Sequence, residues 1–116
     1  MKEKRKIKLL VNEQGQLQSL MRQMEENPSG DYTIASLAKT LQINRHKLQY
    51  GFKTLTRYSI HQFVIKTRMG HAKKLLAETE KPIKEIAILC GYKSHEKFSH
   101  AFKKYFSYSP THARLK

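Results

Sequence analysis

Two groups of polar side chains recur at helical spacing in this chain, and their chemistry suits recognition of base edges. The first group is His46, Gln49 and Tyr50, whose spacing of three and four residues puts them on one helix face. Gln pairs with adenine through two hydrogen bonds, His and Tyr can bond base edges or phosphates, and Tyr can contact a thymine methyl. The second group is His95, Glu96, Lys97 and His100. We expect these seven residues to be the candidates for base contacts.

Each candidate also has a plainer interpretation, because a polar residue on an exposed helix face is usually only solvated. Glu96 is the most ambiguous: it could accept a hydrogen bond from cytosine N4, but a carboxylate in a first turn is also favoured by the helix dipole. The residues slightly favour the helix-dipole interpretation of Glu96 over a cytosine contact. Tyr50 and His46 are the strongest candidates, because large, partly apolar groups on an outward face need a partner more than lysines do.

Phosphate contacts should come from basic side chains and from free amides at helix N-termini. The residues placed for this role are Thr33, Arg45, Lys53, Ser59, Lys104 and Ser109. Ordinary helix capping by the hydroxyl residues is compatible with phosphate binding, and the sequence does not separate the two.

The elements that carry both groups are two copies of one apolar-and-turn pattern. The first copy is Ile34, Leu37, Ala38, Ile43, Leu48, Phe52-Lys53 and Tyr58-Ser59, and the second is Ile83, Ile86, Ala87, Tyr92, Phe98, Phe102-Lys103 and Tyr108-Ser109. The offset is 49 up to Ile43/Tyr92 and 50 afterwards, so one residue is added near Lys93-Ser94. A repeat of this kind predicts a duplicated helix-turn-helix.

Capping and stop residues divide the rest of the chain into helices. A leading helix carries Leu10, Leu17, Leu20, Met21 and Met24 after a basic, frayed start, and it stops at Asn27-Pro28-Ser29-Gly30. Three further helices are expected in the middle of the chain: 34–41 capped by Asp31 or Thr33, 45–55 capped by Asn44, and 59–79 capped by Ser59. Three more follow: 82–90 with Pro82 in the first position and Gly91 as the stop, 94–106 capped by Ser94, and a last one from Ser109-Pro110 onward. The expected buried stripes are Leu48, Phe52 and Leu55; Phe63, Val64, Ala72, Leu75 and Leu76; and Phe98, Phe102 and Phe106.

These seven helices and the lack of a convincing strand predict an all-α fold, with two helix-turn-helix units joined by a long central helix. We expect a basic tail and leading helix in 1–30, a first unit in 31–58, a linker helix in 59–80, and a second unit with a closing helix in 81–116. The central helix can act as a spacer between the units, as packing for both, or as both at once.

Charge limits the partners. The 116 residues carry 23 Lys and Arg against 9 Asp and Glu, a net charge of +14. A field of this size favours nucleic acid over an anionic membrane or an acidic protein. Cys90 is the only cysteine, so no internal disulfide can form, and no apolar run has the length of a membrane span. With no signal peptide evident, we expect a cytoplasmic, nucleoid-associated protein.

Other function classes fit the residues less well. His95-Glu96 opens like a zinc-protease motif, but the next histidine is five residues on instead of four, which turns it to another side of the helix. No Gly-rich phosphate loop, cysteine pair or nucleophile elbow is present, so we expect no enzyme, cofactor or metal. A basic RNA-binding or ribosome-associated helical protein remains the main alternative. A module that docks on a membrane or protein through its leading helix is a second one.

The motifs resemble the DNA-binding region of the AraC/XylS family of bacterial transcription regulators over roughly Tyr32 to Ala113. The resemblance rests on Pro82–Ala87, Gly91-Tyr92, Phe98–Phe106 and Ser109-Pro110, with Arg68–Leu76 in the linker; Lys47–Lys53 and Gly91–Ser94 are similar to regulators of siderophore uptake. It implies two helix-turn-helix units that bind consecutive major grooves of double-stranded DNA. The same seven residues would contact bases, and the two unlike groups imply two unlike half-sites in tandem.

The family also implies features that the motifs do not contain. Members commonly carry a separate sensing or dimerising domain and act with RNA polymerase, often as activators, so this chain is expected to be a fragment or a short stand-alone member. The sequence departs from the family at Arg57 and Ser107, where glycine is usual, and at Ile60, which stands where the second copy has Pro110. If Arg57 and Ser107 need a left-handed backbone, each costs about 1 kcal/mol.

Overall fold

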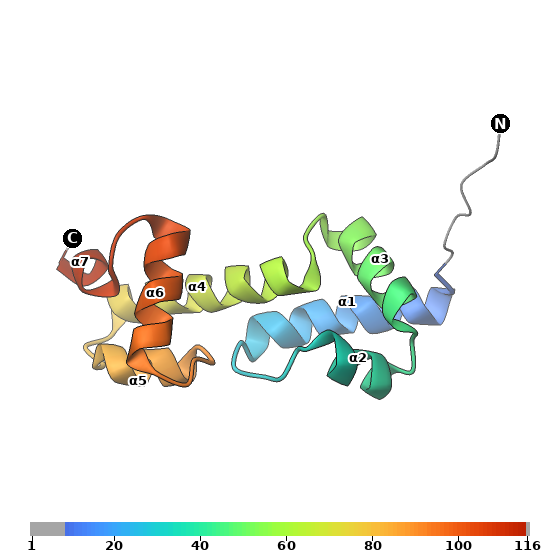
Figure 1. Ribbon diagram of the computed structural model, residues 1–116, viewed down its shortest axis with the longest axis horizontal. Coiled ribbons are helices and arrows are strands. Elements are labelled where there is room, and N and C mark those ends of the chain that lie inside the picture. Colours follow the sequence, from blue (N-terminus) through green and yellow to red (C-terminus); the bar gives the residue numbers. More distant parts are fainter. Residues whose placement is uncertain (1–8, 116) are drawn as a thin grey trace.

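The protein is all-α in the residues that the structure describes, 9–115 of a computed structural model (Figure 1). The predicted basic start lies outside the described residues. The seven helices are α1 (Val11–Glu26), α2 (Ile34–Leu41), α3 (Arg45–Thr56), α4 (Ile60–Glu78), α5 (Ile83–Leu89), α6 (His95–Phe106) and α7 (Pro110–Leu115). The predicted order of a leading helix, a pair, a long helix, a second pair and a closing helix is confirmed.

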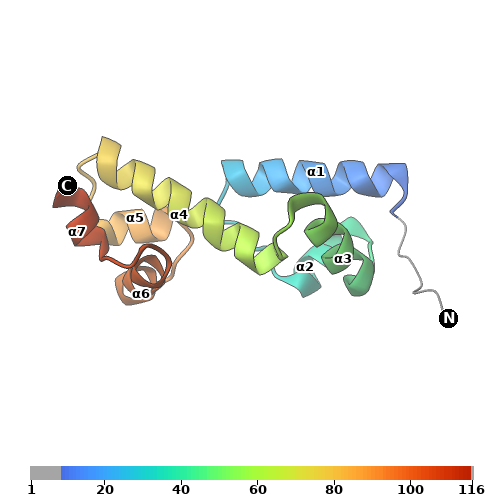
Figure 2. The same ribbon diagram turned by 90° about the horizontal axis from the view of Figure 1, so that it is seen from above.

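The helices form two groups at opposite ends of an elongated molecule, 56 Å long, with α4 running from one group into the other (Figure 1). The first group is α1, α2 and α3, and the second is α5, α6 and α7. Seen from above, α1 lies along one long edge, and α2 and α6 lie toward the other (Figure 2). The fold therefore places its two helix pairs apart along one direction.

Each group has its own apolar core. In the first core, Leu17, Leu48 and Phe52 are completely buried, and Ile60, Phe63 and Val64 complete it from the start of α4. The second core takes Met69, Ala72 and Leu76 from the rest of α4 and packs them against residues such as Ile86, Phe98 and Phe102. The two clusters divide between Val64 and Met69, so α4 serves both cores in succession.

The repeat extends further than the apolar pattern of the two pairs indicates. The buried residues of α1 are Leu17, Leu20 and Met24, and adding 52 to each number gives Met69, Ala72 and Leu76, which are buried on α4. Helix α1 therefore packs on the first pair as α4 packs on the second. The start of α4 likewise corresponds to α7, since Ser59 and Ser109 each cap a helix whose first residue, Ile60 or Pro110, is buried. We call α1–α3 with the start of α4 the first unit, and the remainder of α4 with α5–α7 the second unit.

Most predicted caps are confirmed, and three predictions are wrong. The side chains of Thr33, Asn44, Ser59 and Ser94 accept from first-turn amides, and for α2 the cap is Thr33 and not Asp31. Leu10 is 59% exposed because it precedes α1 as its N-cap instead of joining the apolar stripe. Pro82 is likewise the N-cap of α5, one residue before its first helical position. Leu55 is 37% exposed because the last turn of α3 extends beyond the first core.

Within residues 9–115, four residues at or just after a helix end have a left-handed backbone. Arg57 and Ser107 have φ of 68° and 72°, so both positions have the left-handed backbone considered where the resemblance implies glycine. Gln42, which was not predicted, has φ of 56° and stands where the second unit has Gly91, with φ of 95°. The first unit therefore keeps a side chain at a turn where the second unit has none.

Candidate nucleic-acid interface

The two candidate recognition helices, α3 and α6, are built alike. Each has 12 residues and begins at a polar cap: the Lys47 amide donates to Asn44 Oδ1 at 2.8 Å, and the Lys97 amide donates to Ser94 Oγ at 3.1 Å. In each turn before the cap, one amide returns to the preceding helix, from Ile43 to Ala38 O and from Tyr92 to Ala87 O. The extra residue of the second copy is Lys93, because the offset changes between Tyr92 and Ser94.

All seven base-contact candidates lie on the exposed faces of these two helices. His46, Gln49 and Tyr50 point outward from α3, and the exposed fraction of Tyr50 is 47%. His95, Glu96, Lys97 and His100 are exposed on α6. The structure therefore brings the candidates into two separate groups, one at each end of the molecule, and does not join them into one cluster.

The phosphate candidates are of two kinds. Arg45, Lys53 and Lys104 are exposed basic side chains on α3 and α6. Thr33, Ser59 and Ser109 use their hydroxyl oxygens as acceptors for the amides of Ser36, Gln62 and His112, at 3.3, 3.1 and 3.1 Å. Capping by the three hydroxyl groups is therefore present in the structure.

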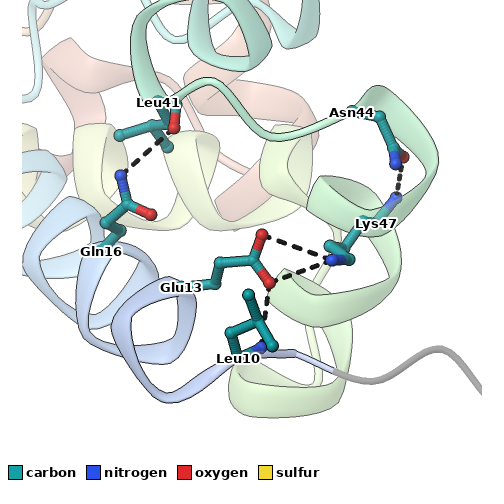
Figure 3. Close-up of polar contacts among 6 residues, drawn as sticks. All are labelled: Leu10, Glu13, Gln16, Leu41, Asn44 and Lys47. Atoms are coloured by element: carbon teal, nitrogen blue, oxygen red, sulfur yellow. Dashed lines mark hydrogen bonds and ion pairs between the residues drawn. The ribbon is translucent and has the colours of Figure 1, made fainter.

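Lys47 and Lys97 are equivalent in the repeat but differ in their surroundings. The Lys47 ammonium lies 3.1 and 3.3 Å from the two carboxylate oxygens of Glu13 on α1 (Figure 3). The Leu10 amide donates to the same carboxylate at 2.9 Å, and these bonds lower the pKa of Glu13 below its usual range. Residue 65, the α4 equivalent of Glu13, is Ile, so Lys97 has no such carboxylate on α4.

Sequence reasoning did not anticipate this contact between α1 and α3. One turn after Glu13, the side-chain amide of Gln16 donates to Leu41 O at 3.2 Å, so α1 holds both helices of the first pair through polar groups (Figure 3). The available sequence signal was the offset of 52 between α1 and α4, because it aligns the charged Glu13 with the apolar Ile65.

An aromatic cluster packs on the buried face of α6. The ring centroid of Phe102 lies 5.8 Å from that of Phe98 and 4.6 Å from that of Phe106, and Tyr108 stacks on Phe106 at 5.9 Å. Such pairs contribute about 0.5–1.5 kcal/mol each beyond area burial. This packing fixes the direction of α6 and leaves its polar face free.

No cluster of metal-ligating side chains is evident among residues 9–115. Cys90 is fully buried, and burial raises the pKa of its thiol to about 11, so it is an inert part of the second core as predicted. Within the described chain, no three His, Cys, Asp or Glu side chains gather as a metal site would require. None of the described helices combines the length and apolarity that crossing a bilayer requires.

Comparison with known proteins agrees with this geometry. The model of the family described as "Helix-turn-helix domain" matches residues 37–116. The transcriptional activator RhaR of Mannheimia succiniciproducens is 33% identical over 98 residues, which are 84% of this chain and 36% of RhaR. The chain spans about a third or less of the length of the curated relatives it matches first.

Two solved structures share the fold. The C-terminal domain of AraT, a response regulator from Geobacillus stearothermophilus, superposes with a TM-score of 0.79 at 32% identity and covers 85% of this chain and 83% of its own. The DNA-binding domain of AdpA, solved in complex with a target DNA, has the same TM-score at 23% identity and covers 85% of this chain and 89% of its own. With its duplicated helix-turn-helix and these relatives, the chain belongs to the AraC/XylS family of transcription regulators.

Proposed function

We propose that this chain binds double-stranded DNA by inserting α3 and α6 into two consecutive major grooves, and that it thereby regulates bacterial transcription. The single observation that carries the proposal is the pair of equivalent, N-capped helices, which present exposed polar faces at opposite ends of α4. Major grooves on one side of a duplex recur about every 34 Å. A molecule 56 Å long can therefore reach two of them.

The two helices have unlike outward faces, so they read unlike half-sites in tandem. His46, Gln49 and Tyr50 contact bases in one groove, and His95, Glu96, Lys97 and His100 contact bases in the other. The phosphates around the two grooves are bound by Thr33, Arg45, Lys53, Ser59, Lys104 and Ser109. The reading segments are 31–58 and 81–116, with 1–30 and 59–80 as supporting elements.

The wider role is proposed by analogy with the family. The chain acts in the bacterial cytoplasm, on the nucleoid, as the DNA-binding part of a longer regulator with a sensing or dimerisation domain. Contact with RNA polymerase makes it an activator. The +14 charge supports action on nucleic acid, the name of RhaR as an activator supports activation, and the greater length of RhaR supports a further domain.

In-vitro selection of duplex sites followed by footprinting tests the proposal directly. We expect two protected blocks, ~10 bp apart on one face of the duplex. A Gln49→Ala variant should relax the base preference in one block only, whereas a Lys53→Ala variant should weaken binding to every sequence alike. A single short block would contradict the two-groove arrangement.

Salt dependence gives an independent measure. If about six to eight phosphates are neutralised, the logarithm of affinity should fall with the logarithm of salt concentration at a slope of roughly −5 to −7. An affinity that barely changes with salt would contradict the proposal. Stronger competition by structured RNA than by duplex DNA would favour the RNA-binding alternative instead.

A further inference from the structure

The two units share no common apolar core, so something other than core packing must fix how they face each other. The first core ends at Val64 of α4 and the second begins at Met69. Arg68 lies between these two residues and is partly buried. It is therefore placed on the linker helix at the border between the units.

The guanidinium of Arg68 contacts both units at once. Its Nε donates to Pro28 O at 2.9 Å and its Nη2 donates to Gly30 O at 3.4 Å, both in the loop between α1 and α2. Its Cζ also lies over the ring of Tyr92, 5.4 Å from the centroid, in the turn that precedes α6. None of the ion pairs among residues 9–115 includes Arg68, so neutral groups of both units hold its charge.

The loop that receives Arg68 is longer than its counterpart. From Asn27 to Thr33, the connection is three residues longer than the one from Thr79 to Pro82 in the second unit. Tyr32 anchors the longer loop, because its ring is buried in the first core and its hydroxyl donates to Gln23 O and Asn27 O, at 3.2 and 2.5 Å. The additional residues thus form a fixed projection of the first unit.

The turn of the second unit comes very close to this projection. A Cβ on Gly91 would lie 2.9 Å from Arg68 Nε and 3.0 Å from Ser29 Cα, so only glycine permits the approach. Farther along α4, His71 Nε2 lies 2.8 Å from Glu25 O at the end of α1. We call the contacts of the Pro28–Gly30 loop, Arg68 and Gly91-Tyr92 the Arg68 junction.

We propose that Arg68 is a positioning residue that locks the two helix-turn-helix units at one relative orientation and thereby sets the spacing between the two DNA blocks that the chain accepts. This rests on the proposed two-groove function. Linked binding modules gain affinity over single ones only when their geometry allows both to bind together. Without the junction, the units would be connected by α4 and by the contact of His71 with Glu25 O, and twisting or bending about the middle of α4 would spread their orientations.

The first test needs no DNA. Spin labels on Thr54→Cys and Lys103→Cys report the distance between α3 and α6 by pulsed electron resonance, while Cys90 is buried and should take no label. We expect a narrow distance distribution in the parent chain and a clearly broader one in Arg68→Met and in Arg68→Lys. A lysine keeps the charge but lacks the planar fork that bonds two carbonyls while stacking on a ring.

Arg114→Met is the matched control. Arg114 also donates to backbone carbonyls, of Leu76 at 3.4 Å and Thr79 at 3.1 Å, but these lie inside the second unit. Its removal deletes the same charge and should leave the distance distribution narrow. Equal distributions in the parent chain and both Arg68 variants, with helical circular dichroism retained, would overturn the junction. This result would hold whether or not the chain binds DNA.

The second test uses the selected two-block duplex, the same duplex with one base pair added or removed between the blocks, and single-block duplexes. Arg68→Met should bind the two-block site about tenfold more weakly and lose discrimination between spacings, with single-block affinity unchanged. Arg114→Met should keep the spacing preference. Equal losses on single-block and two-block DNA, together with full rescue by Arg68→Lys, would mean that Arg68 is a phosphate contact and would overturn the proposal. Failure to select any two-block duplex would instead reject the proposed function.

Discussion

In the first unit, α1 reaches the recognition helix with a carboxylate, whereas the equivalent stretch of α4 in the second unit is apolar. Glu13 therefore binds Lys47 in one copy, while Ile65 joins the core and leaves Lys97 exposed in the other. The two turns also differ: at the equivalent left-handed position the first unit has Gln42, which is strained there, and the second has Gly91, which is not. One frame thus supports two recognition helices that differ in exposed charge and in the strain of the turn before them.

The largest expected effect tests whether the two units are energetically separate. Phe52 and Phe102 are equivalent, and both are fully buried, so Phe52→Ala or Phe102→Ala should each cost about 3–5 kcal/mol. Because the cores are distinct, hydrogen exchange should rise mainly in α2 and α3 for the first variant and in α5 and α6 for the second. Equal loss of protection throughout the chain in both variants would show a single cooperative unit.

Smaller effects on the free energy of unfolding, opposite in sign to each other, are expected from substitutions at the two equivalent turns. Gly91→Ala should lower the free energy of unfolding by about 2 kcal/mol, because alanine is strained at φ of 95° and its Cβ would meet Arg68 and Ser29. Gln42→Gly should raise it by about 0.5 kcal/mol, since relief of left-handed strain exceeds the added freedom of the unfolded chain. Chemical denaturation of the two variants measures both, and changes of the same sign would remove this difference between the units.

The smallest expected effect concerns Glu13. Its pKa in the folded protein lies below the ordinary value of about 4.3, so its bonds stabilise the fold above that pH and are lost as the pH falls through the lowered pKa. Glu13→Gln should therefore have a lower urea midpoint than the parent chain at pH 7, and the difference should shrink as the pH falls through the lowered pKa of Glu13. Because the change also frees Lys47, binding to DNA of random sequence should strengthen. A difference between the two chains that does not vary with pH would contradict the role of the carboxylate.

The helices and their caps were accessible from the sequence because capping depends on local residues. Asn44, Ser59 and Ser94 each precede a run of apolar residues at helical spacing, and each caps the helix expected of it. The outward positions of His46 and Tyr50 followed from the same periodicity. Leu55 was misjudged because periodicity predicts which face is apolar, but not how far along the helix the core extends.

Contacts between elements that are distant in the chain were not accessible in this way. Nothing near Glu13 indicates that its partner is Lys47, 34 residues away, and nothing near Arg68 indicates two carbonyls about 40 residues earlier. Gln42 was missed for a different reason: glutamine carries no local signal for a left-handed backbone. Only its alignment with Gly91 in the repeat could have pointed to it.

The double use of α4 has a consequence for how such a chain could be enlarged. One end of α4 completes the first core and the remainder opens the second, and Ser109-Pro110 begins α7 as Ser59-Ile60 begins α4. The connectivity is therefore that of a solenoid, in which each copy closes on the helix that starts the next. A third copy spliced in after Pro110 would find its first helix already begun by α7, so the fold could grow by whole copies without a new linker.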